Sequence, residues 1–158
     1  MRTRTGLIAT LITLAVVAVA VPLAGASGVN HNRLAIGIKL TFDSSSHAAG
    51  SFAACCAVND HGSAEANILS FKATTGDEAT FRATNTYAGA NGTFTILLTG
   101  ETGPLSSQIH IARAHWTVTS GTGAYTTLHG DGRLTAVTDE TGSLTAVADG
   151  EAHGAEDH

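Results

Sequence analysis

The stretch Leu34-Ala35-Ile36-Gly37-Ile38-Lys39-Leu40-Thr41-Phe42 places a large apolar residue at every second position. Successive side chains of a β-strand point to opposite faces, so this alternation predicts a strand with one face in a core. The intervening residues are small or polar, which suits the other face. No other part of the chain carries a clearer strand signal.

Further segments with alternating apolar residues follow along the chain. They span residues 50–58, 64–72, 78–87, 93–99, 108–119, 133–138 and 143–148. Turn-forming residues separate them, at 59–62, 75–77, 89–92, 100–104 and 139–142. Pro104, the only proline after Pro22, stands in one of these predicted turns. Eight strands joined by hairpin-length links indicate an all-β antiparallel barrel or sandwich.

The amino-terminal residues have the composition of a secretory signal peptide. Arg2 and Arg4 precede a weakly polar and apolar run over 6–20, and Ala24-Gly25-Ala26 offers small residues for cleavage before Ser27. A retained anchor is the alternative, but the run is shorter than the ~20 residues that a spanning helix needs. We therefore expect a secreted, extracellular protein with no integral membrane segment after processing.

This processing gives a simple domain organisation. We expect a signal peptide over 1–26, a linker over 27–33, one barrel domain over 34–152, and an acidic, histidine-containing tail over 153–158. The chain carries eight basic and 13 acidic residues, and cleavage would remove two of the basic ones, so the mature net charge is −7. That balance disfavours nucleic acid and anionic membranes as partners, because both are bound by clustered Lys or Arg.

The two cysteines, Cys55 and Cys56, are adjacent. Neighbouring side chains of an extended strand point to opposite faces, so such a backbone cannot close the pair into one bridge. The first interpretation is therefore two small apolar strand residues. A strained vicinal disulfide, an intermolecular bridge and a catalytic thiol remain as alternatives, because a secreted protein meets oxidising conditions.

The apolar pattern of the segment 108–119 changes parity, since Ile109 and Ile111 are odd-numbered whereas Trp116 and Val118 are even-numbered. This change predicts a β-bulge near Arg113. Without this bulge His110 and His115 would face apart, and with it they could converge on a metal ion. Because the spacing of the histidines is otherwise poor for ligands, we expect no metal site and no cofactor.

The most specific motif runs from Trp116 to Gly132, with the sequence WTVTSGTGAYTTLHGDG. We interpret it as a strand that ends in a glycine-rich corner, a short turn that points Tyr125 and Leu128 inward, and a second strand. Small glycines would let that second strand approach closely. The predicted structural residues are Gly121, Gly123, Tyr125, Leu128, Gly130 and Gly132.

This motif resembles the W-x-V-x-x-G-T-G-x-Y-x-x-L-x-G-x-G signature of the allene oxide cyclase-like and dirigent-like barrels, especially small secreted bacterial members of unassigned function. The stretches 50–62 and 92–96 are similar to two further motifs of that group, and the resemblance covers roughly 34–152. It implies an eight-stranded antiparallel, calycin-like barrel with a small apolar cavity, and trimers as in plant relatives. The pair Cys55-Cys56 departs from the group, which tends to have a small residue and Gly there.

Low charge and the lack of a paired acid/base motif favour a non-catalytic function. We expect a barrel that binds a small apolar molecule or serves as an extracellular interaction module. The candidate pocket residues are Phe52, Cys56, His115, Trp116 and Tyr125. One alternative is a cofactor-free cyclase or isomerase, which would need an acid or base in the pocket and whose catalytic residues the sequence does not identify. Another is a structural homo-oligomer, such as a trimer, associated with the cell envelope.

Overall fold

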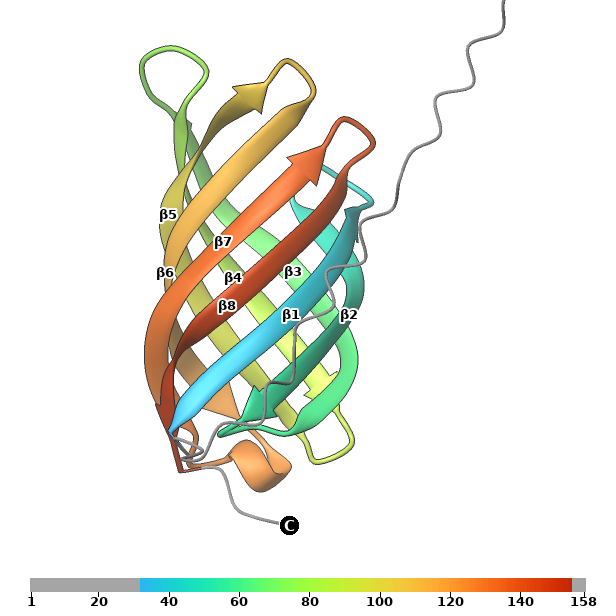
Figure 1. Ribbon diagram of the computed structural model, residues 1–158, viewed down its shortest axis with the longest axis vertical. Helices are drawn as coiled ribbons and strands as arrows, with labels where there is room; N and C mark the ends of the chain where they lie inside the picture. Colours follow the sequence, from blue (N-terminus) through green and yellow to red (C-terminus); the bar gives the residue numbers. More distant parts are fainter. Residues whose placement is uncertain (1–31, 155–158) are drawn as a thin grey trace, which may run out of the picture.

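The computed structural model describes residues 32–154, which form a closed barrel of eight antiparallel strands (Figure 1). Each strand pairs with the next along the chain, and β8 pairs with β1 to close the barrel. The strands are β1 (Arg33–Phe42), β2 (His47–Cys56), β3 (Asp60–Ala73), β4 (Ala79–Gly89), β5 (Thr93–Ser106), β6 (Ile109–Gly121), β7 (His129–Asp139) and β8 (Ser143–His153). One 3-10 turn, η1 (Gly123–Tyr125), joins β6 to β7. The predicted all-β, eight-stranded antiparallel barrel is confirmed, whereas the predicted signal peptide lies outside the described residues.

The barrel interior is filled by the side chains that the alternating pattern selects. In β1 these are Leu34, Ile36, Ile38 and Leu40, all of which are buried. Most other strands contribute alanines together with one or two large residues, because the interior of an eight-stranded barrel has little room. The buried alanines within strands are Ala48, Ala54, Ala64, Ala66, Ala79, Ala83, Ala114, Ala136, Ala146, Ala148 and Ala152.

The turn predicted at 100–104 is wrong, because these residues belong to β5, which continues to Ser106. Pro104 is tolerated in this strand because the pairing with β4 ends at Thr102, so the proline has a neighbouring strand only on the β6 side. The turn predicted at 59–62 lies earlier in the chain, because β3 already begins at Asp60. Sequence alternation weakens near strand ends, where long hairpins project beyond the barrel.

The bulge predicted near Arg113 is also wrong. Arg113 pairs regularly with Glu101 on one side and Thr135 on the other. Ile111 instead lies on the outer face opposite Val137, so its odd parity reflects an apolar contact on the outer surface. The register shifts that the structure does contain leave one extra residue in three strands, namely Leu69, Leu105 and Thr119.

Glycines on β7 and β8 make room for the indole ring of Trp116. A Cβ atom at Gly132 or at Gly150 would lie 2.6 Å from Cζ2 of Trp116. Gly123 has a φ of +59°, the left-handed conformation that favours glycine at a corner. Tyr125 and Leu128 are both buried, which confirms their predicted inward orientation.

Candidate functional site

The lower end of the barrel in Figure 1 is closed by η1 and by a buried carboxylate. Asp60 Oδ2 accepts a hydrogen bond from the Tyr125 hydroxyl at 2.8 Å and from the Asn91 backbone N–H at 3.1 Å. Its Oδ1 accepts the backbone N–H groups of His61 and Ala90 at 2.8 and 3.1 Å. Asp60 thus ties three separate connections together at this end.

The electrostatics of this contact favour an ionised Asp60. Burial opposes ionisation, but the hydrogen bonds from Asn91, Tyr125, His61 and Ala90 outweigh it and lower the pKa of Asp60. Burial, together with the bond to Asp60, raises the pKa of Tyr125 to about 12, so its hydroxyl keeps the proton that it donates. The sequence pattern placed Asp60 in a turn over 59–62 and missed this role.

An aromatic cluster fills the barrel just above the closed end. The ring centroid of Tyr87 lies 5.1 Å from that of Phe52 and 4.8 Å from that of Phe94, and the Phe94 centroid lies 5.4 Å from that of Tyr125. All four side chains are at least 97% buried. Tilted and edge-on rings at these spacings form a stable packed core. Two candidate pocket residues, Phe52 and Tyr125, therefore lie together in a filled part of the barrel.

Of the other three candidate pocket residues, only Trp116 is buried in the same core. Its ring lies against Gly132 and Gly150, and its indole N–H donates to the backbone carbonyl of Arg133 at 3.1 Å. The side chain of His115 is 60% exposed on the outer face, 3.8 Å from Asp131. Cys56 is exposed at the end of β2. The structure does not bring the five candidates into one site.

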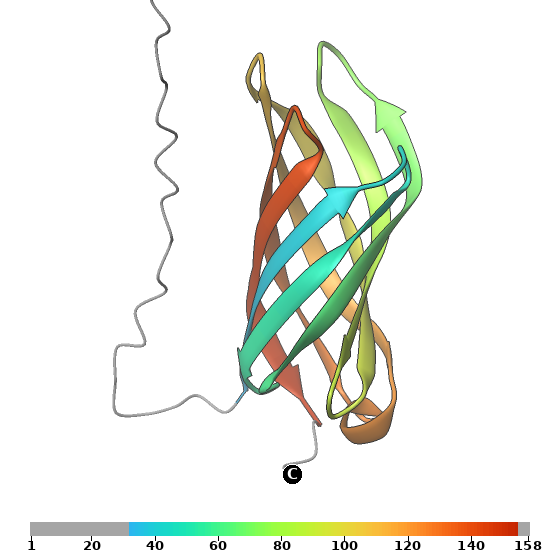
Figure 2. The same cartoon turned by 90° about the vertical axis from the view of Figure 1, so that its right-hand side faces the viewer.

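The upper end of the barrel is more open. Phe42, Ile68, Phe81 and Leu144 continue the inward-facing rows of their strands, yet each is only half-buried. The β3–β4 and β5–β6 hairpins rise beyond the other connections at this end (Figure 2). The rows of apolar side chains therefore end in contact with solvent, and we call this end, lined by these four residues and Phe71, the mouth.

Phe71 is the most exposed aromatic side chain at the mouth, at 64%. Phe71 pairs directly with Phe81 across the hairpin, so both side chains lie on the same side of the sheet. The extra residue Leu69 shifts the register of β3 and thereby turns Phe71 toward this inner side. Sequence alternation alone placed Phe71 on the opposite face from Ile68, so the pattern missed it.

A depression of about 420 Å³ lies between the two projecting hairpins. Its lining combines apolar and polar residues, namely Phe71, Ala73, Ala79 and Pro104 with Asp77, Glu78, Ser106, Ser107 and His110. A larger depression, of about 680 Å³, shares some of these residues but is lined mainly by Thr, Asp and Glu side chains together with Arg113. We favour the smaller one as the candidate site, because the exposed Phe71 lines it and small-molecule sites combine apolar side chains with a few polar groups.

One interior polar group, Asn85, lies deeper in the barrel on β4, the strand that carries Phe81. Asn85 is 5% exposed, and its Nδ2 donates to the Tyr87 hydroxyl at 3.2 Å. Its Oδ1 is the one fully buried side-chain polar atom in residues 32–154 without a hydrogen-bond partner. Asn85 follows Phe81 by four residues, so it lies about 13 Å further into the barrel. An unpartnered buried oxygen is unfavourable and is open to a hydrogen-bond donor.

Within the described residues no three His, Cys, Asp or Glu side chains gather as metal ligands, and no helix there has the length and apolarity to cross a membrane. His110 and His115 lie on opposite faces of β6 and do not converge. No protein-family model, no curated protein and no solved structure matches the chain. Function is therefore inferred from the mouth and the barrel interior.

Proposed function

We propose that the protein binds a small, mainly apolar molecule at the mouth of the barrel. The observation that carries the proposal is Phe71, an aromatic side chain 64% exposed on the inner side of a hairpin and bordering a depression. Transfer of such a surface out of water is favourable by about 25 cal/mol per Å². A depression of about 420 Å³ also lies within the range of ~300–1,000 Å³ of small-molecule sites.

The proposed ligand carries one hydrogen-bond donor, such as a hydroxyl group, at its inner end. A donor that reached Asn85 would pair with the free Oδ1 atom and remove the unfavourable state of a buried, unpartnered oxygen. Asn85 pairs across the sheet with Ala66 and Ile96, so one of its two neighbours there is a small side chain. An apolar molecule with a single hydroxyl group matches this combination.

Binding rather than catalysis is supported by the state of the buried ionisable groups. Asp60 accepts four hydrogen bonds at the closed end, and Tyr125 holds its proton there, so neither is free to exchange a proton with a ligand at the mouth. We place this binding outside the cell because residues 1–26 have the pattern of a signal peptide. The resemblance to the allene oxide cyclase-like group is consistent with an apolar ligand, and the trimer stays a prediction.

The test is titration of the purified protein with the fluorescent apolar probe 1-anilinonaphthalene-8-sulfonate, followed by displacement with straight-chain alcohols. We expect Phe71→Ser to weaken probe binding about tenfold or more, because it removes the largest apolar surface at the mouth. Val147→Ser is the matched control, since Val147 is 56% exposed but lies on the outer face of β8. Equal effects of the two substitutions, or no effect of Phe71→Ser, would contradict the proposal.

A further inference from the structure

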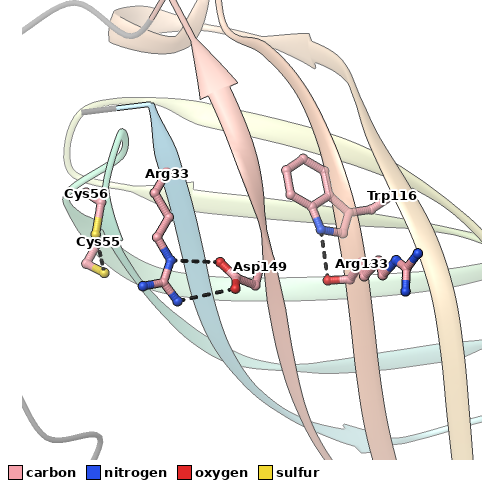
Figure 3. A network of polar contacts seen from close by, with 6 residues as sticks. All are labelled: Arg33, Cys55, Cys56, Trp116, Arg133 and Asp149. Carbon is pink, nitrogen blue, oxygen red and sulfur yellow. Dashed lines mark hydrogen bonds and ion pairs between the residues drawn. The ribbon is translucent and has the colours of Figure 1, made fainter. Parts of the chain in front are cut away.

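The two cysteines lie at the closed end of the barrel, where β2 ends (Figure 3). Their Sγ atoms are 2.9 Å apart, and both residues are exposed. The expectation that adjacent cysteines point to opposite faces is wrong here, because Cys56 is not extended: its φ is +81°. Left-handed backbone turns the Cys56 side chain toward that of Cys55.

This backbone conformation is unusual for a residue with a side chain. Among residues 32–154, Cys56 alone combines a positive φ with a residue type other than glycine. Such a conformation costs about 1–3 kcal/mol and persists where the surrounding structure holds it. Here the next residue, Ala57, donates its N–H to the Arg33 carbonyl at 2.8 Å, and Cys55 pairs with Ala35 of β1. The β1 strand therefore holds the two sulfurs together.

The charges around the pair come from β1 and β8. Arg33 lies beside the cysteines, and its Nε and Nη2 donate to the Asp149 carboxylate at 3.0 and 3.2 Å. Hydrogen bonding to Cys56, together with burial, raises the pKa of the Cys55 thiol to about 11. Cys55 therefore keeps its proton at neutral pH.

We propose that Cys55 and Cys56 form a two-electron redox site that closes reversibly into a disulfide between neighbours by exchange with a low-molecular-weight disulfide. The Cys56 thiolate attacks one sulfur of the small disulfide, whose S–S bond breaks and releases one small thiol after protonation. Cys55 then loses its proton and attacks Cys56 Sγ, which releases the second small thiol. Two protein thiols are oxidised, and one small disulfide is reduced to two thiols.

This site is independent of the proposed ligand site. The cysteines end β2 at the closed end, whereas Phe71 and the depression lie at the mouth. The exposed position also explains how a small disulfide reaches the sulfurs, since neither thiol is enclosed by the barrel. The pair is therefore a second functional feature on the same scaffold.

The test is incubation of the purified protein with oxidised glutathione, followed by acid quenching and intact-mass measurement. We expect a monomer lighter by two hydrogen atoms that resists iodoacetamide and returns to the starting mass with dithiothreitol. Cys55→Ser should instead stop at a stable glutathione adduct on Cys56, because no second thiol is present to displace it. Cys56→Gly suits the left-handed backbone and should keep the fold, with Cys55 as the one remaining cysteine.

Three results would overturn the proposal. In the first, the unmodified protein accumulates the same stable glutathione adduct as Cys55→Ser. In the second, it forms a disulfide-linked dimer in place of the lighter monomer. In the third, neither thiol reacts in the folded protein while both react after denaturation.

Discussion

The two ends of the barrel are built from the same alternating strands but differ beyond the last inward-facing residue of each strand. At the closed end, η1 brings Tyr125 onto the buried Asp60, and an aromatic cluster fills the space above it. At the mouth, the inward rows end in half-buried residues and in the exposed Phe71. The closed end therefore provides stability, and the mouth offers apolar surface for binding.

The largest expected effect is the difference in stability between two truncations, Phe94→Ala at the closed end and Phe71→Ala at the mouth. Phe94→Ala should lower the free energy of unfolding by about 3–5 kcal/mol, because it leaves a cavity among packed rings. Phe71→Ala should change it by less than about 0.5 kcal/mol, because that side chain is largely in solvent. Urea denaturation followed by circular dichroism measures both. Similar losses would show that the mouth is as tightly packed as the closed end.

The buried carboxylate should make stability depend on acid. The folded-state pKa of Asp60 lies below its unfolded value, so ionised Asp60 stabilises the protein above about pH 4, and this contribution is lost as the pH falls through the folded value. Asp60→Asn should lower the free energy of unfolding by about 2–3 kcal/mol at pH 7 and reduce the acid dependence. Urea melts between pH 7 and pH 3 measure this.

The control for this substitution is Asp139→Asn in the β7–β8 turn, an exposed carboxylate that also accepts local hydrogen bonds. The pKa of Asp139 is lowered as well, by hydrogen bonds from Thr141 and Ser143, so its substitution should remove some acid dependence but less stability than Asp60→Asn. Equal losses for the two variants would mean that the Asp60–Tyr125 contact contributes no more than a surface turn.

A smaller effect is expected from adding one methyl group beside Trp116. The Cβ atom of Gly150→Ala would lie 2.6 Å from both Trp116 Cζ2 and Gly132 Cα, so the variant should lose about 1–3 kcal/mol. Gly37→Ala is the matched control on β1, because the nearest atom to its Cβ is 3.9 Å away. Thermal unfolding of the two variants compares them, and an equally stable Gly150→Ala would show that the wall around Trp116 can yield.

The smallest effect concerns the interior oxygen between the two ends. If a ligand hydroxyl group pairs with Asn85 Oδ1, Asn85→Leu should weaken binding of a straight-chain alcohol about fivefold relative to an alkane of the same length. Displacement of the fluorescent probe measures both ligands. Parallel changes for alcohol and alkane would show that the oxygen does not contact the ligand and that binding stops at the mouth.

The alternating strands and the glycine corner could be predicted from the sequence because both rest on local patterns. Alternation in β1 identifies its buried row, and the spacing from Trp116 to Gly132 identifies the corner that points Tyr125 inward. The candidate pocket was harder to predict. Phe71 changes face through the extra residue Leu69, and a register shift of this kind leaves no mark on composition.

The sequence by itself determined an all-β fold of alternating strands, the buried row of β1 and the glycine corner after Trp116, since these depend on the two-residue period of a strand and on steric limits of the backbone. Only the tertiary structure decided which end is closed, that Asp60 is buried, and that Cys55 and Cys56 meet. Those features depend on contacts between residues far apart in the chain or on one backbone angle, and neither is encoded in a local repeat.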